Sequence, residues 1–332
     1  MSIECYVNAV AQVSCQKPLS EEWMDAPCIM ETDYVRALEP NAKQYISPGE
    51  ARRMSKILAR AVCTSFNALE KAQVKNPDAI ITGTGKGCME NSEKFLQDLS
   101  SYGESCLKPS LFMQSTHNTI SSQIAILLKC HGYNNTYSHK GISFESALFD
   151  AWIQIKAGNF RNALIGSHDE VTPLMSKIIR CNHPDYGFIS ESSVSAVLSN
   201  EKSNLNICEV SDVKIFHRPK IEFLEDVLRN DHTSVLVLGL NGNPLNDTPY
   251  YELLKSIQYQ GVVLQYKNIF GDNFSSPAIG FYVGVKLIET QRVPSILYVN
   301  DSPLCGQSID NITIINHSDA IDWTVIQIKR SI

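Results

Sequence analysis

The stretch NNTYSHKGISFESALFDAW, residues 134–152, carries side chains that could do nucleophilic chemistry. Ser138, His139 and Ser143 lie close together there, and hydrolases use a serine activated by a histidine. The G-x-S-x-G pattern of the nucleophile elbow is absent, and neighbours in sequence rarely adopt triad geometry. Two interpretations stay open at this point: a structural turn, or a hydrolase that uses Ser138 or Ser143.

Other chemistry-bearing side chains occur near strand and helix ends. His117 could act as a base, although a lone histidine more often has a structural role. The run Ser167-His168-Asp169-Glu170 could bind a metal or transfer protons. Consecutive strand residues point to opposite faces, so these four cannot all converge on one site. We expect them to position a loop, and we expect no metal site.

A glycine-rich segment, Gly83-Thr84-Gly85-Lys86-Gly87, follows a predicted strand and precedes a predicted helix. Loops of this kind can hold a dinucleotide or a phosphate group. The segment lacks the G-x-G-x-x-G register and the Walker lysine followed by serine or threonine. The pattern therefore favours a tight structural turn, and no cofactor is expected.

Composition restricts the possible partners and the cellular compartment. The 332 residues are 43% hydrophobic and 19% charged, with a net charge of −6 and no basic run. This balance argues against binding to nucleic acid or to an anionic membrane. The ten cysteines form no CxxC pair, several lie in apolar segments, and no signal peptide or membrane span is evident. We expect a cytoplasmic protein with reduced thiols.

Alternating strand and helix patterns predict an α/β fold. The pattern predicts one helix over residues 48–73, a strand hairpin over 187–201 and closing strands at 295–299 and 323–329. After about residue 203 the order of elements partly repeats. We therefore expect two similar βαβ-based halves, residues 1–203 and a shortened 204–332, packed as one body.

Several segments, taken in chain order, resemble the β-ketoacyl synthases, which are condensing enzymes of the thiolase fold. The resemblance implies a five-layered αβαβα body. The matching segments are EARRMSKILARAVCTSFNALEKAQ (50–73), similar to an EARRMD helix that ends in ALEDAG; ITGTGKG (81–87), similar to VGSGIGG; NALIGSHDE (162–170), similar to a strand that ends in AGGAE; GFISESSVSAVLSNE (187–201), similar to GFVLGEGAGVLVLE; NGNPLND (241–247), similar to TGTPLGD; and KNIFGDNFSSPAIGFYVGVKLI (267–288), similar to KSMTGHTLGAAGGLEAI.

The family's chemistry uses a cysteine at a helix N-terminus and two histidines that stabilise an enolate. Carried over by position, the cysteine falls on Gly141, the first histidine on Gly239 and the second on Asp272. Only the family's lysine is retained, as Lys267, with Glu170 as a possible remnant of its acid. The resemblance therefore implies that no catalytic residue remains.

Because it has no cysteine at this position, the chain resembles the chain length factors of this family. Its short length resembles that of the aryl-polyene and flexirubin type. Such subunits pair with a catalytic synthase, meet acyl carrier protein through that partner and wall an acyl tunnel. Two alternatives stay open: an active acyltransferase with a non-standard nucleophile such as Cys88, and a homodimeric acyl-binding protein. By analogy, the residues facing the partner or tunnel are Phe112, Met113, Thr116, His117, Asn118, Tyr137, His139 and Phe144.

Overall fold

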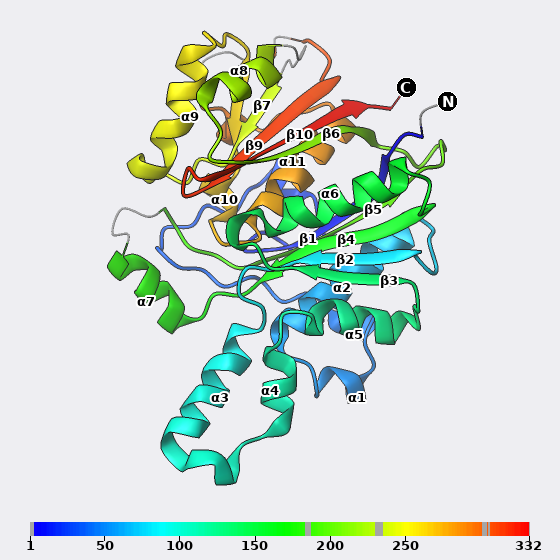
Figure 1. The fold of residues 1–332 in the computed structure, drawn as a ribbon, viewed down its shortest axis with the longest axis vertical. Helices are drawn as coiled ribbons and strands as arrows, with labels where there is room; N and C mark the ends of the chain where they lie inside the picture. The colour runs from blue at the N-terminus through cyan, green and yellow to red at the C-terminus, as the bar shows by residue number, and fades with distance from the viewer. Residues whose placement is uncertain (1–2, 183–186, 230–234, 301–303, 305, 332) are drawn as a thin grey trace.

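The computed structural model describes residues 3–182, 187–229, 235–300, 304 and 306–331, and within this part ten strands form one sheet. The strand order is β3-β2-β4-β5-β1-β6-β10-β9-β7-β8 (Figure 1). The strands are β1 (Tyr6–Val13), β2 (Ala79–Gly83), β3 (Tyr133–Tyr137), β4 (Asn162–Asp169), β5 (Ser192–Ser199), β6 (Cys208–His217), β7 (Val235–Leu238), β8 (Val262–Gln265), β9 (Asn311–Ser318) and β10 (Asp322–Arg330).

Helices form three layers around the two halves of this sheet. Helices α2 and α5 cover the outer face of the first half, and α8 and α9 cover the outer face of the second. Helices α6 and α11 lie between the two halves, so the layers are αβαβα as predicted. The helices are α1 (Pro48–Ala51), α2 (Lys56–Lys71), α3 (Met89–Tyr102), α4 (Pro109–Ser115), α5 (Thr119–Leu128), α6 (Ser143–Lys156), α7 (Pro173–Asn182), α8 (Ile221–Arg229), α9 (Pro244–Ser256), α10 (Lys267–Phe270) and α11 (Ser276–Thr290).

The two halves of the sheet have the same topology. The order β3-β2-β4-β5-β1 recurs as β8-β7-β9-β10-β6, with the same parallel and antiparallel pairings. The halves join where Tyr6 and Val7 of β1 pair with β6. This repeat is what an internal duplication would produce. The exact boundary at residues 203 and 204, which lies between β5 and β6, stays a prediction.

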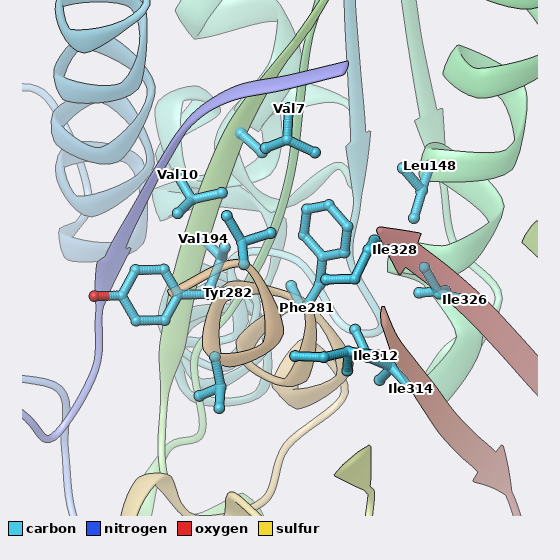
Figure 2. Packing of buried hydrophobic residues seen from close by; sticks show 14 of the residues in the cluster. Val7, Val10, Leu148, Val194, Phe281, Tyr282, Ile312, Ile314, Ile326 and Ile328 are labelled. Carbon is cyan, nitrogen blue, oxygen red and sulfur yellow. The ribbon is translucent and has the colours of Figure 1, made fainter. Parts of the chain in front are cut away.

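Helix α11 fills the space between the halves. Its residues from Ser276 to Ile288 are all buried, which explains why most of its sequence is apolar; the exception with a charge, Lys286, pairs with Glu21 and Glu289. Figure 2 shows Phe281 and Tyr282 projecting from this helix among side chains of both halves. Among the described residues, no helix combines the length and apolar character that crossing a bilayer requires.

The two edges of the sheet differ in how they are covered. At β8, the Val299 amide donates to the Val263 carbonyl at 2.9 Å, and the Asn300 side chain accepts from the Val263 amide at 3.2 Å. At β3, the other edge, the Thr136 amide donates to the side chain of its own neighbour Asn135. No described strand lies beyond β3, so this edge is open to another chain.

Three details of the predicted elements are wrong. The helix expected over 48–73 is divided, because Ser55 adopts extended backbone angles between α1 and α2. The hairpin expected over 187–201 is the single strand β5, which pairs with β4 on one side and β1 on the other. The strand expected at 295–299 begins as a 3-10 helix, Ser295–Leu297, and the pattern missed β9.

Candidate functional site

The turn to which the sequence assigns the position of the family's nucleophile lies between β3 and α6. Gly141 belongs to a short 3-10 helix, η4 (Lys140–Ile142), directly before α6. Ser143 Oγ donates to the carbonyls of Thr84 and Lys140 at 3.1 and 2.7 Å, and accepts from the His139 amide at 2.9 Å. The Ser143 hydroxyl is fully buried and holds the turn together, which is a structural role.

The three positions assigned to the lost catalytic groups converge at the ends of β7 and β9. A Cβ built on Gly141 would lie 3.2 Å from the Ser318 side chain, at the end of β9. The Gly239 amide donates to the Ile315 carbonyl of β9 at 3.1 Å. Asp272 accepts from the side chain of Asn241, two residues beyond Gly239, at 2.8 Å. None of the three positions carries a thiol or an imidazole, and their assignment to the family's catalytic groups stays a prediction.

The space beside Gly239 is occupied by other side chains of the chain itself. A Cβ built on Gly239 would overlap Asn316 Oδ1 and would lie 2.8 Å from Tyr250 Oη. Asn316 Oδ1 also accepts from Tyr266 Oη at 2.8 Å. A histidine side chain has no room here unless these groups move.

We expect Gly239→Ala to lower the free energy of unfolding by roughly 1–3 kcal/mol, because the added methyl group overpacks a rigid polar contact. The measurement is urea denaturation of both proteins. Gly49→Ala is the matched control, since nothing lies within 4 Å of a Cβ at that position. Equal stability of the two variants would show that the space beside Gly239 is not filled.

Lys267 and Asp272 form a buried ion pair at this site. Lys267 Nζ lies 2.9 Å from Asp272 Oδ1, and the two residues are only 9% and 5% exposed. The Asp272 carboxylate also accepts from Asn241 Nδ2 at 2.8 Å and from Ser276 Oγ at 2.7 Å. Lys267 is therefore engaged inside the chain, with its charge balanced.

Sequence reasoning missed Glu145, in the first turn of α6. This side chain is fully buried and accepts from Thr324 Oγ1 at 2.9 Å and Asn316 Nδ2 at 3.3 Å. Burial raises the pKa of Glu145 to about 7, against the opposing effect of these donors and of Lys267. A signal was present, because Glu145 shares a helical face with Leu148 and Trp152, where a carboxylate is out of place.

The buried carboxylate of Glu170 contacts the start of α3. Its Oε1 accepts from the Glu90 amide at 2.8 Å, at the start of α3. Burial raises the pKa of Glu170 to about 7, nearby Glu90 and Glu191 add to this rise, and Arg60 opposes it. Glu170 thus positions the helical hairpin formed by α3 and α4, which extends from the body in Figure 1.

Asp169 explains the glycine-rich turn. Its buried carboxylate accepts from Thr84 Oγ1 at 2.9 Å, the Gly85 amide at 2.8 Å, the Lys86 amide at 2.9 Å and Ser275 Oγ at 2.6 Å. The amides that could have cradled a phosphate therefore bind an internal carboxylate. The structural interpretation of the turn is confirmed.

Other candidate nucleophiles and bases lack activating surroundings. Cys88 is buried, and this burial raises the pKa of its thiol to about 12, so the reactive thiolate is suppressed. His168 is fully buried, its ring nitrogens have no hydrogen-bond partner among the described residues, and burial lowers its pKa to about 3. Within the described part, no group of three or more His, Cys, Asp or Glu is arranged to hold a metal.

His139 instead contacts a serine that the sequence did not single out. His139 Nδ1 lies 2.9 Å from Ser146 Oγ, and Ser146 Oγ also donates to the Ile142 carbonyl at 2.9 Å. Both side chains line an apolar groove of about 360 Å³ beside β3, together with Tyr137, Phe149, Asp150, Ile153, Ile142 and Ile215. No carboxylate is shown to hydrogen-bond His139 in this structure.

Seven of the eight residues expected at a partner or tunnel face are exposed or half-buried: Phe112, Met113, Thr116, His117, Asn118, Tyr137 and His139. Phe144 is different, because its ring is fully buried in the central core, 5.4 Å from the ring of Phe281. Phe144 is therefore not available at the surface. Their contact with a partner stays a prediction.

Comparison with known proteins agrees with this architecture. Residues 22–204, more than half of the chain, match the family model described as beta-ketoacyl synthase, N-terminal domain. No curated protein sequence matches the chain.

Solved structures of low sequence identity share the fold over 100% of both chains. One is a type II PKS acyl-carrier protein in complex with its ketosynthase bound to the hexaketide (TM-score 0.80, 12% identity). Others are the ishigamide ketosynthase/chain length factor (0.81, 14%) and a beta-ketoacyl synthase from Burkholderia phymatum (0.75, 11%). With the family match and the thiolase-like fold together, the chain belongs to the β-ketoacyl synthase family.

Proposed function

We propose that this chain is a catalytically silent subunit, of the chain length factor kind, that pairs with an active β-ketoacyl synthase. In the pair it would line the acyl tunnel during elongation of a polyketide, aryl-polyene or fatty-acid-like chain. The partner would supply the cysteine and the histidines and would receive acyl carrier protein. The described cysteines are free and five are buried, which fits the cytoplasmic location included in this proposal.

The observation that carries the proposal is the content of the convergent site. By the assignment from the sequence, Gly141, Gly239 and Asp272 would stand in place of a thiol and two imidazoles, and none of them can form a thioester or stabilise an enolate in the family's manner. Loss of one catalytic group costs orders of magnitude in rate. Asn316 and Tyr250 occupy the space beside Gly239, so the site is also closed sterically.

The open edge at β3 supports the pairing. Exposed large hydrophobic side chains lie on β3 and on α5 and α6, the helices that contact it: Tyr133, Ile126 and Ile153. An open strand edge beside apolar side chains is a surface that folded proteins normally cover. The relatives described as ketosynthase/chain length factor and as a ketosynthase with its acyl-carrier protein fit the same kind of assembly.

Co-expression with a β-ketoacyl synthase encoded in the same genome tests the proposal. We expect the two chains to co-elute in gel filtration, and condensation of a malonyl-carrier substrate to require both. The reason is that the synthase tunnel would lack one wall when this chain is absent. If the synthase is equally active alone and this chain remains apart from it, the proposal is wrong.

A second candidate is an acyltransferase or esterase with a serine nucleophile in the apolar groove, where His139 Nδ1 lies 2.9 Å from Ser146 Oγ. Activation by His139 would require the Ser146 hydroxyl to turn from the Ile142 carbonyl to Nδ1. A homodimer that binds an acyl chain in this groove is the related non-enzymatic candidate. Hydrolysis of a p-nitrophenyl acyl ester that is lost in Ser146→Ala and kept in Ser138→Ala would support the serine enzyme. Tight binding of an acyl chain by a homodimer, without turnover, would support the non-enzymatic acyl-binding protein instead.

A further inference from the structure

A hollow of about 660 Å³ lies where three loops meet at the amino ends of the neighbouring parallel strands β2, β3 and β4. The turns discussed above follow the carboxyl ends of β2 and β3, so this hollow is at the opposite end of these strands. We name it the amino-end hollow, and its lining residues are Asn76, Pro77, Asp78, Lys129, Cys130, His131, Gly132, Gly158, Asn159, Phe160 and Arg161.

Main-chain contacts to Asp78 hold the three loops together. Asp78 Oδ2 accepts from the amides of Arg161 and Asn162 at 2.8 and 3.2 Å. The Asp78 carbonyl accepts from the Tyr133 amide at 3.0 Å. Gly132 approaches this carbonyl so closely that an added Cβ would lie 2.2 Å from it. The loops are therefore fixed by the fold, and the hollow is formed before any ligand binds.

Three basic side chains line the hollow and are exposed: Lys129, His131 and Arg161. Within the part of the chain that the structure describes, none of them has an ion pair or a side-chain hydrogen bond. Asp78 is the one acidic residue in the described lining, and two amides already occupy one of its oxygens. Two cations against one carboxylate leave a positive charge here, although the whole chain carries −6.

A structural alternative is that these cations stabilise the carboxyl ends of α5 and α6, which lie beside the hollow. Carbonyls in the last turns of both helices already have backbone donors. The Cys130 amide donates to the Ala125 carbonyl of α5 at 2.9 Å. The Asn159 amide donates to the Gln154 carbonyl of α6 at 2.9 Å. The basic side chains are therefore available to an acceptor from outside the chain.

We propose that the amino-end hollow binds the phosphate monoester of a small organic molecule. The planar guanidinium of Arg161 would bind two phosphate oxygens, and the Lys129 ammonium would bind a third. The hollow is larger than one phosphate group, so it also has room for an organic part. Phe160, whose ring lies 5.4 Å from that of Tyr133, supplies an apolar wall for this part.

The charge of the whole chain favours a small ligand over a large one. A net charge of −6 repels an extended polyanion such as an anionic membrane or a nucleic acid. A small phosphate ester meets mainly the local positive charge, because charges beyond about 10 Å are screened by salt. The inference does not depend on the proposed pairing with a synthase.

Calorimetric titration of the full chain with glucose 6-phosphate tests the proposal. We expect a Kd below about 1 mM at low ionic strength. Glucose has the same sugar without the phosphate group, and we expect it to bind at least about 10-fold more weakly. Binding of glucose 6-phosphate that is no tighter than binding of glucose would overturn the proposal.

Two variants locate the binding in the hollow. Arg161→Gln and Lys129→Gln should each weaken the binding of glucose 6-phosphate by about 10-fold or more, because each removes a charged donor. Lys129 has a φ of 53°, and glutamine adopts similar angles elsewhere in this chain, so its replacement suits the backbone. Lys43→Gln is the matched control, because Lys43 is an exposed lysine that does not line the hollow.

Equal binding by the two hollow variants and the control would contradict the proposal and leave the cations with the structural role at the helix ends. Phosphatidic acid presents the same phosphate monoester on a membrane, so vesicles that contain it distinguish the source of the ligand. Binding to these vesicles without binding to glucose 6-phosphate would likewise overturn the assignment of a small molecule.

Discussion

Replacing Asp169 with alanine is expected to lower the free energy of unfolding by roughly 3–5 kcal/mol, because several buried donors lose their acceptor at once. These donors are the hydroxyls of Thr84 and Ser275 and the amides of Gly85 and Lys86. Ser275 precedes α11, so the same carboxylate joins the glycine-rich turn to the second half. The measurement is urea unfolding followed by circular dichroism.

Asp25→Ala is the matched control for this variant. Asp25 is also an aspartate in a charged contact, with Arg292, but both side chains are more than 60% exposed. Exposed ion pairs contribute little, so this variant should stay within about 0.5 kcal/mol of the unaltered chain. If Asp169→Ala were no more destabilised than Asp25→Ala, the Asp169 contacts would not contribute to holding the glycine-rich turn against the second half.

Asn134→Pro is expected to weaken association with the proposed partner by roughly 100-fold or more, because it removes a backbone donor from the open strand edge. The Tyr133 amide donates toward β2, to the Asp78 carbonyl, and Thr84 donates to the Tyr137 carbonyl. Residues 133 and 137 therefore face β2, and the Asn134 amide points outward. Gel filtration and titration with the synthase measure the effect.

Asn134→Thr isolates the role of that amide. Both variants lose the contact of the Asn134 side chain with the Ser121 carbonyl, but threonine keeps the backbone donor and suits a strand. Proline on an edge strand is tolerated by the fold itself, so the unfolding transition of Asn134→Pro should resemble that of Asn134→Thr. Equal binding by both variants would show that β3 is not the pairing edge.

Local sequence patterns predicted much of the architecture. The alternation of apolar strands and amphipathic helices indicated an α/β fold, and the ordered motifs indicated the five layers and the family. The positions Gly141, Gly239 and Asp272 were assigned by counting residues along the sequence from those motifs, which requires no structure. Strand pairing could not be predicted in the same way, because whether 187–201 is one strand or two depends on which distant strands lie on each side.

Tertiary structure decided what surrounds these positions. Glu145 meets Thr324 and Asn316, almost two hundred residues away in the chain, only because α6 is enclosed between the halves. The same enclosure buries Phe144 against Phe281 and removes it from the expected partner surface. The prediction that the family's catalytic groups are missing came from residue identity alone. Packing between the halves determined which side chains surround the assigned positions. The reason is that burial, pKa shifts and unpaired strand edges depend on residues that come together from distant parts of the chain.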